Sequence, residues 1–219
     1  MREQVNILIA AATKLEITPS LAFCKKNRIP VVFTGVGAAP SVYNIVKATL
    51  RFNPSIIIQA GIAGCFSRQY RLGEVLAVSQ EQFADLGVEE NKQWRSLFDL
   101  GFVQPNEKPF KGGYLKNPHT KIWKQLNLPA VPGITVNEIS TNKARIQLLK
   151  AQDAVVESME GAALHYVALM EKIPFLQVRS LSNYVGERDK SKWNFKDAIG
   201  NLNKELVRII EQMAGSSHV

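Results

Sequence analysis

Two glutamates stand at points of the chain where they could share one site. Glu16 follows an apolar run at 5–11, and Glu160 comes two residues after Ser158, at the predicted start of a helix. A carboxylate beside a bound water can act as a general base. A carboxylate with free lone pairs can also accept hydrogen bonds from two neighbouring hydroxyls. The two glutamates therefore suit a site that binds a sugar and activates water.

Three polar residues, Arg179, Ser182 and Asn183, come where the apolar run at 174–182 ends. A guanidinium, a hydroxyl and an amide together offer donors and acceptors to a heterocyclic ligand. No Gly-x-Ser-x-Gly elbow or Ser–His–acid set supports nucleophilic catalysis. Each residue also has an ordinary structural interpretation: Glu160, for example, could serve only to stabilise the first turn of its own helix.

The elements that would position these residues alternate between strands and helices. Near-continuous apolar runs are typical of strands covered on both faces, and apolar residues at i, i+3, i+4 and i+7 predict helices. We predict an α/β fold, a single three-layer domain over residues 1–219 with a mixed, mostly parallel sheet flanked by helices. The predicted strands lie at 5–11, 30–37, 55–64, 74–79 and 174–182, and the predicted helices at about 41–50, 158–172 and 195–213.

Ligands of α/β sheets bind beyond the carboxyl ends of the strands, which is where the candidate residues lie. Glycines in TGVG (34–37) and AGIAG (60–64) would let the backbone approach a ligand closely. They do not form G-x-G-x-x-G, so a dinucleotide site is not favoured. Residues 84–133 are rich in charge, glycine and proline, and we predict an insertion with weak secondary structure there.

The composition is that of an ordinary globular protein of 219 residues, 46% hydrophobic and with a net charge of +8. The charge is not accompanied by a recognised nucleic-acid motif, so a nucleic-acid partner is not favoured. No apolar run approaches the roughly 18–20 residues that span a bilayer, so no membrane partner is expected. Two cysteines form no disulfide framework and suggest a reducing, cytoplasmic location. The three histidines are scattered, and neither metal nor cofactor is expected.

Two motifs together resemble the nucleoside phosphorylase/nucleosidase superfamily. The stretch SMEGAALHYV (158–167) is similar to its Met-Glu ribose motif, and VRSLSN (178–183) is similar to its Arg-x-x-Ser-Asp/Asn purine motif. Order and spacing agree from residue 5 to residue 213. The runs RSLSNYVGERDKSKW (179–193), ADLGVEE (84–90) and SLFDLGF (96–102) resemble the branch that hydrolyses a 6-oxopurine nucleoside for the alternative menaquinone route. The resemblance implies a small-molecule nucleoside substrate and a homo-oligomer, with a dimer as the expected form.

On the sugar side, the resemblance assigns a role to each matching position. Glu16 would be the general base on the attacking water, and Thr34 and Arg179 would help to hold that water. Met159 would lie against the ribose, while Glu160 would bind its hydroxyls.

On the base side, Asn183 matches the residue that activates the leaving purine, with Ser182 beside it in the same motif. Ile139 falls roughly where the superfamily places an apolar residue against the base. The substrate of the branch carries a benzoate beyond C5′. Its carboxylate calls for a cation or a hydroxyl, and Arg188 is a candidate, as are Lys190 and Lys192. A solvated charged loop is the alternative interpretation of these three.

Three other functions stay open. A phosphorylase would need a phosphate site, usually with an arginine near the end of the first strand. Here that turn is AATKLE (11–16), where an acid would repel phosphate. Methylthioadenosine/adenosylhomocysteine nucleosidases carry aspartate where this chain has Asn183; an amide offers two donors to the N7 and O6 acceptors of a 6-oxopurine, whereas a protonated acid suits a 6-aminopurine. A non-catalytic nucleotide-binding module is the third alternative.

Overall fold

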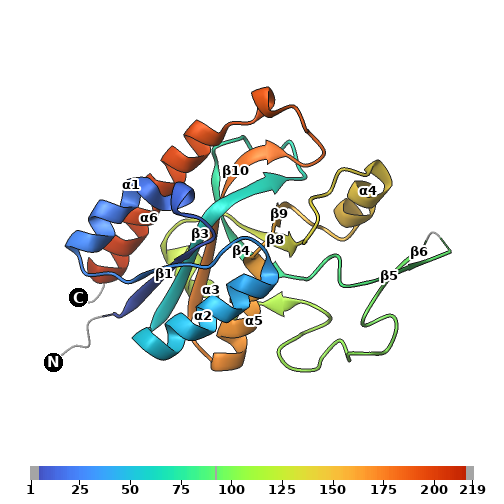
Figure 1. Cartoon of the computed structure of the whole chain (residues 1–219), viewed down its shortest axis with the longest axis horizontal. Coiled ribbons are helices and arrows are strands. Elements are labelled where there is room, and N and C mark those ends of the chain that lie inside the picture. The colour runs from blue at the N-terminus through green and yellow to red at the C-terminus, as the bar shows by residue number, and fades with distance from the viewer. Residues whose placement is uncertain (1–4, 92, 216–219) are drawn as a thin grey trace.

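A computed structural model describes residues 5–91 and 93–215 (Figure 1). The ends of the predicted domain, residues 1–4 and 216–219, lie outside the described residues, as does residue 92. The chain alternates between strands and helices, as predicted, except at 56–116, where the described strands follow one another without a helix. The strands are β1 (Ile7–Ala11), β2 (Val31–Phe33), β3 (Ile56–Cys65), β4 (Val75–Glu81), β5 (Gly87–Glu90), β6 (Gln93–Ser96), β7 (Leu115–Lys116), β8 (Ala130–Thr135), β9 (Val156–Ser158) and β10 (Phe175–Tyr184). The α-helices are α1 (Lys14–Lys26), α2 (Ala38–Phe52), α3 (Thr120–Gln125), α4 (Lys143–Ala151), α5 (Gly161–Glu171) and α6 (Phe195–Gly215).

The main sheet is mixed, as predicted, but it is not an open, mostly parallel sheet. Its order is β10-β4-β8-β9-β3-β1-β2, and β10 also pairs with β3, so the strands from β3 to β10 close into a barrel-like ring. Closure brings antiparallel neighbours together: β10 with β4, and β3 with β9. The prediction failed because β8 and β9, which close the ring, were not recognised as strands.

Two layers of helices cover the sheet, which explains the unbroken apolar runs of its strands. Along β1, Ile7 and Ile9 pack in a cluster with α1 and α6, while Leu8 and Ala10 pack in a cluster with α2 and α5. Successive side chains of a strand point to opposite faces. Figure 1 shows α1 and α6 together on one side of the sheet and α2 and α5 on the other.

The segment at 84–133 is only in part the weakly structured insertion that we predicted. Its first half holds the short antiparallel pair β5–β6, which reaches away from the sheet in Figure 1. Its end, however, runs into β8, a buried strand parallel to β4. Pro132 sits at an irregularity in that pairing, where the register shifts between Val78 and Gln80. Among the described residues, no helix is both long and apolar enough to span a membrane.

Candidate active site

Seven of the nine predicted site residues meet at one cavity of about 290 Å³, beyond the carboxyl ends of β3 and β10. Its described wall comes from seven stretches of the chain, including the start of α1, the end of β3 and the segment after β10. Of the nine residues predicted for the site, the following line it: Glu16, Ile139, Met159, Glu160, Ser182, Asn183 and Arg188.

Glu16 lies in the first turn of α1, with its carboxylate held on both oxygens. Oε2 accepts hydrogen bonds from the Thr13 N–H at 2.9 Å and the Thr13 hydroxyl at 3.1 Å, and Oε1 accepts from the Ile62 N–H at 3.1 Å. The bonds to Thr13 also cap the helix, so the structural role and the proposed catalytic role coexist. A carboxylate fixed by three donors keeps one orientation towards the cavity.

The C-terminal helix α6 fixes the helix that carries Glu16. The Asn203 side chain accepts from the Ser20 N–H at 3.1 Å and donates to the Glu16 carbonyl at 2.8 Å. In an unbroken α-helix these two groups would bond to each other, because an N–H bonds to the carbonyl four residues earlier. Pro19 lies next to this break and lacks an N–H. Asn203 therefore completes the hydrogen-bond ladder of α1, a role that no sequence pattern predicts.

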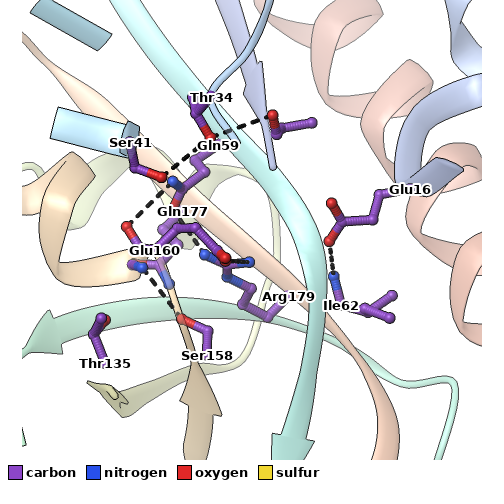
Figure 2. A network of polar contacts seen from close by, with 12 residues as sticks. Glu16, Thr34, Ser41, Gln59, Ile62, Thr135, Ser158, Glu160, Gln177 and Arg179 are labelled. Carbon is purple, nitrogen blue, oxygen red and sulfur yellow. Dashed lines mark hydrogen bonds and ion pairs between the residues drawn. The ribbon is translucent and has the colours of Figure 1, made fainter. Parts of the chain in front are cut away.

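Glu160 and Arg179 form a buried ion pair at the floor of the site. Glu160 Oε2 lies 3.6 Å from Arg179 Nη1, and Glu160 Oε1 accepts from the Gly37 N–H at 3.1 Å. Arg179 is only 1% exposed, and its Nη2 donates to Gln59 Oε1 at 2.9 Å. Figure 2 shows these side chains close together. A methyl group on Gly61 would collide with Arg179 Nη1 and would lie 2.8 Å from Glu16 Oε1, so only glycine fits between them.

A second carboxylate, Glu81, lies behind Glu160. It accepts from Gln177 Nε2 at 2.9 Å and from the Thr135 hydroxyl at 3.1 Å. Burial raises the pKa of Glu81 to about 7, although both hydrogen bonds oppose the change. A side chain at Gly161 would collide with Glu81, which accounts for the glycine at the start of α5.

A buried histidine, His165, lies near Gln177. His165 Nδ1 donates to the Leu115 carbonyl at 2.8 Å, and burial lowers the pKa of His165 to about 4. Neither His165 Nε2 nor Gln177 Oε1 has a hydrogen-bond partner among the described residues.

Asn183 and Ser182 face the cavity at the end of β10, where the hydroxyl lies next to the amide. The Ser182 hydroxyl lies 2.8 Å from Asn183 Oδ1 and 3.2 Å from the Ala63 carbonyl, and the Tyr184 carbonyl, which can only accept, identifies the other amide atom as the NH₂. That group makes one weaker bond, to the Tyr184 carbonyl at 3.2 Å, so at least one N–H remains for a ligand. The amide therefore offers donors to whatever occupies the cavity.

Two of the predicted site residues, Arg179 and Thr34, are not among the residues that line the cavity. Arg179 is behind Glu160, and the Thr34 hydroxyl is fully buried and bonded to Ser41 at 3.2 Å. Glu160 itself is not in the first turn of a helix, as we had predicted, but is the residue before α5 begins. Ser158 still helps to cap that helix, because its hydroxyl accepts from the Gly161 N–H at 3.2 Å.

Of the three basic residues after β10, only Arg188 lines the cavity. Its guanidinium lies 5.7 Å from the centre of the Trp193 ring, which also lines the cavity. Lys192 instead pairs with Glu187 at 3.1 Å. Arg188 therefore lies at the site, whereas Lys190 and Lys192 are not among the residues that line the cavity.

Sequence reasoning missed several wall residues, of which Glu157 and Ser140 are polar and buried. Glu157 stands directly before the Met-Glu motif, but a three-residue strand gives too short a pattern to predict which way a side chain points. Trp193, in the segment after β10, and Phe195, the first residue of α6, also line the cavity. The sequence feature that could have identified them as wall residues is that they are aromatic residues in a charged stretch.

Comparison with known proteins gives the same relationship as the motifs. The family described as Phosphorylase superfamily matches residues 16–214. A futalosine hydrolase from Thermus thermophilus is 28% identical over 188 residues, which cover 84% of this chain and 81% of that protein. A 5′-methylthioadenosine/S-adenosylhomocysteine nucleosidase from Arabidopsis thaliana is 26% identical over 187 residues, which cover 82% of this chain and 68% of that protein.

A solved structure shares the fold over nearly the whole chain. The apo form of Arabidopsis thaliana 5′-methylthioadenosine nucleosidase superposes with a TM-score of 0.75 and 22% identity, covering 95% of this chain and 96% of that one. The family match begins at Glu16 and includes all the described residues of the cavity wall except Ala12, Thr13 and Leu15. The resemblance expected from the two motifs is confirmed, and the chain belongs to the phosphorylase superfamily.

Proposed function

We propose that this protein hydrolyses the N-glycosidic bond of futalosine, releasing hypoxanthine and dehypoxanthine futalosine, as a step of the alternative route to menaquinone. The observation that carries the proposal is the orientation of Asn183. Its NH₂, identified by the bond to the Tyr184 carbonyl, has an N–H left for a ligand. A 6-oxopurine such as hypoxanthine presents two acceptors, N7 and O6, to such a donor.

The chemistry follows from where charge develops. Breaking the bond leaves positive charge on the sugar and negative charge on the departing purine, so stabilising both is the main task. Glu160 accepts from the ribose hydroxyls and keeps a carboxylate near the sugar, with Met159 against its other face. Glu16 takes a proton from the water that attacks C1′. Asn183 donates to the purine as it leaves. No step calls for a metal or cofactor.

Hydrolysis is favoured over phosphorolysis by the charges of the wall. Of the described residues that line the cavity, Arg188 is the one cation, and it lies after β10, away from the turn that precedes α1. Glu16 lines the end of the cavity that is next to this turn. Arg179 lies across Gly61 from Glu16, but it is buried and paired with Glu160, so phosphate would meet the Glu16 carboxylate without a free cation of the described cavity wall beside it.

The second candidate is a methylthioadenosine/adenosylhomocysteine nucleosidase. A relative of that name is nearly as similar to this chain as the futalosine hydrolase is. The decisive assay measures purine release from futalosine, inosine and methylthioadenosine, each with and without phosphate. We expect hypoxanthine from futalosine at the highest kcat/KM, independent of phosphate. Faster cleavage of methylthioadenosine would favour the second candidate, and a phosphate-dependent sugar phosphate would make the protein a phosphorylase.

Glu16→Gln separates an enzyme from a binding module. We expect kcat/KM to fall by about 10³-fold, within the range for loss of a general base, while hypoxanthine binding measured by calorimetry stays within about threefold. Glu138→Gln is the matched control, because Glu138 is exposed and outside the cavity wall. Wild-type protein that binds the base but releases none from any nucleoside would leave only a binding module.

The protein is proposed to act in the cytoplasm as a homodimer. Cys24 and Cys65 are both free, as expected in a reducing compartment. Light scattering on the purified protein measures the oligomeric state directly, and a mass of one chain would contradict the dimer.

A further inference from the structure

The chain between β8 and α4 carries part of the cavity wall, because Ile139 and Ser140 both line the cavity. This loop (137–142) contains no helix or strand, so no ladder of backbone hydrogen bonds fixes it. Side chains from other segments hold its backbone instead. One of them is the buried Glu157 of β9, whose Oε1 accepts from the Ser140 N–H at 3.1 Å.

Asp85, which lies between β4 and β5, holds the same loop on the other side of Ile139. Asp85 Oδ2 accepts from the Asn137 N–H and, at 3.4 Å, from the Glu138 N–H. Asp85 Oδ1 accepts from the side-chain amide of Asn137 at 3.3 Å. The two carboxylates therefore bond to the backbone before and after Ile139, so the position of this part of the wall depends on both.

Arg145, on α4, is a cation that acts on both carboxylates. Burial lowers the pKa of Arg145, and the charges of Asp85 and Glu157 oppose that change. Burial raises the pKa of Glu157; the charge of Asp85 adds to that change, whereas the charge of Arg145 opposes it. Asp85 and Glu157 thus repel each other, and Arg145 offsets the repulsion. Loss of this cation would weaken both carboxylate contacts with the loop.

Arg145 also connects the loop to the β5–β6 pair, which reaches away from the sheet. Its guanidinium donates to the Ala84 carbonyl, next to Asp85, and lies 4.4 Å from the centre of the Trp94 ring in β6. A cation over an aromatic face is attracted to it. The N–H of Arg145 donates to Asn142 Oδ1 at 3.1 Å, at the end of the same loop. One residue therefore contacts the β5–β6 pair, the segment that carries Asp85 and the loop of the cavity wall.

We propose that Arg145 and Asp85 are positioning residues for the purine: together they fix the loop at 137–142 so that Ile139 stays packed against the base. Neither is among the described residues that line the cavity, so both act through the loop and not on the ligand. The inference rests on the proposed function, since it needs a base beside Ile139. A loop that is already fixed loses less conformational entropy when a ligand binds. We therefore expect both residues to affect binding of the purine more than the chemical step.

Arg145→Met tests the proposal, because methionine keeps much of the length and removes the charge and the donors. We expect the KM for futalosine and the Kd for hypoxanthine, measured by calorimetry, to rise about 10-fold, the effect of losing one hydrogen bond to a charged group, while kcat stays within about twofold. Arg145→Lys, which keeps the cation, should restore part of the affinity. Arg95→Met is the matched control, because Arg95 lies on the same β5–β6 pair in an exposed ion pair with Glu90, and it should leave both constants unchanged. Asp85→Asn should act in the same direction as Arg145→Met and provides the same test should that variant fail to fold.

Hydrogen exchange measures how firmly the loop is held without any ligand. The amides of Asn137, Glu138 and Ser140 are bonded to the two carboxylates, so we expect them to exchange about 10-fold faster in Arg145→Met, with the amides of β1 as an internal control. Unchanged exchange in the loop would overturn the proposal. A similar increase in β1 would mean a general loss of stability and would overturn it too, as would faster loop exchange with wild-type affinity for hypoxanthine.

The same measurements separate this inference from the proposed function. If futalosine is cleaved while Arg145→Met and Asp85→Asn behave as wild type, the proposed function stands and only this inference fails. If wild-type protein neither binds hypoxanthine nor cleaves futalosine, both fail.

Discussion

Two groups of residues at the cavity differ in how their carboxylates are satisfied before any ligand arrives. In the group that we call the ribose half after its proposed ligand (Gln59, Glu81, Glu160, Gln177 and Arg179), each carboxylate has a donor or cation at both oxygens, although Gln177 Oε1 and Arg179 Nε have no hydrogen-bond partner among the described residues. In the base half (Ser140, Glu157, Ser182, Asn183 and Arg188), Glu157 has one oxygen without a partner and Asn183 has an N–H to spare.

Because of this difference, we expect the ribose half to affect the stability of the fold and the base half to affect recognition of the ligand. A buried charge must be compensated within the fold, so the ribose half contributes to the free energy of unfolding. The base half keeps an N–H of Asn183 whose hydrogen bond forms only with a ligand, so its contribution is to binding. Substitutions in the first half should change stability as well as activity, and substitutions in the second half should change substrate preference alone.

The largest effect is expected from Arg179→Met. Methionine keeps much of the length but leaves Glu160 as a buried charge without its cation, and removing one partner of a buried pair costs about 3 kcal/mol or more. We expect the free energy of unfolding in urea to fall by about that amount, with loss of activity.

Arg95→Met is the matched control for Arg179→Met. Its ion pair with Glu90 has nearly the same length, 3.5 Å, but both side chains are about half exposed. An exposed pair contributes about 1 kcal/mol at most. Similar losses in the two variants would show that the ribose half does not depend on buried charge.

Glu81→Gln should change how stability depends on pH. Because the pKa of Glu81 is about 7 in the folded protein and ordinarily 4.5, the folded state holds a proton that the unfolded state has released between these values. Its contribution to stability is therefore full below pH 4.5 and is lost as the pH rises through 7. We expect wild-type protein, relative to the variant, to lose about 3 kcal/mol between pH 5 and pH 8.

Urea unfolding at four pH values checks this prediction. His165, with its lowered pKa, has the opposite effect, because its unfolded form takes up a proton as the pH falls from 6.5 towards 4. The His165 contribution is common to both proteins, so the difference between them isolates Glu81. A difference that stays constant from pH 5 to pH 8 would exclude a protonated Glu81.

Asn183→Asp is the corresponding test of the base half. Aspartic acid matches a 6-aminopurine, so the ratio of kcat/KM for inosine to that for adenosine should fall by about 10-fold to 100-fold. The free energy of unfolding should change little. Asn106→Asp, at an exposed loop position, is the control. An unchanged ratio in Asn183→Asp would remove the main support for a 6-oxopurine substrate.

Arg188→Ala should have the smallest and most selective effect. Arg188 is exposed at the rim of the cavity, so its contact with a substrate carboxylate is screened by water. We expect KM to rise about fivefold for futalosine and not at all for inosine, which has no such carboxylate. Lys190→Ala, outside the cavity wall, is the control. Equal effects on both substrates would exclude carboxylate recognition by Arg188.

The long elements of the fold could be predicted, whereas the short ones that close the sheet could not. The strands at β1, β3, β4 and β10 and the helices α2, α5 and α6 were evident from apolar runs or stripes. In β8, Pro132 and Gly133 are typical of turns. Gly133 is needed because a side chain there would lie 2.8 Å from Glu81 Oε1. Helix α1 lacks a strong apolar stripe and contains Pro19.

For the site, local motifs identified candidate residues but not which residues contact one another. Met159, Glu160, Ser182 and Asn183 were found because they occur in compact motifs. Glu157 and Asn203 escaped because their positions at the site depend on partners far away in the chain, at Gly64 and Ser20 respectively. Register between distant strands and the insertion of one side chain into another helix have no periodic signal in a sequence.

The ring that β10 closes also determines when this protein can become active during synthesis. β3 and β4 leave the ribosome early, but β10 pairs with both, and Asn203 completes the helix of Glu16 from α6. A nascent or truncated chain that ends before residue 175 would expose two buried strand edges and hold no Arg179 for Glu160. Such long-range pairing folds slowly and exposes partly folded chains to aggregation. Nearly the whole chain must therefore be made before the cavity is complete.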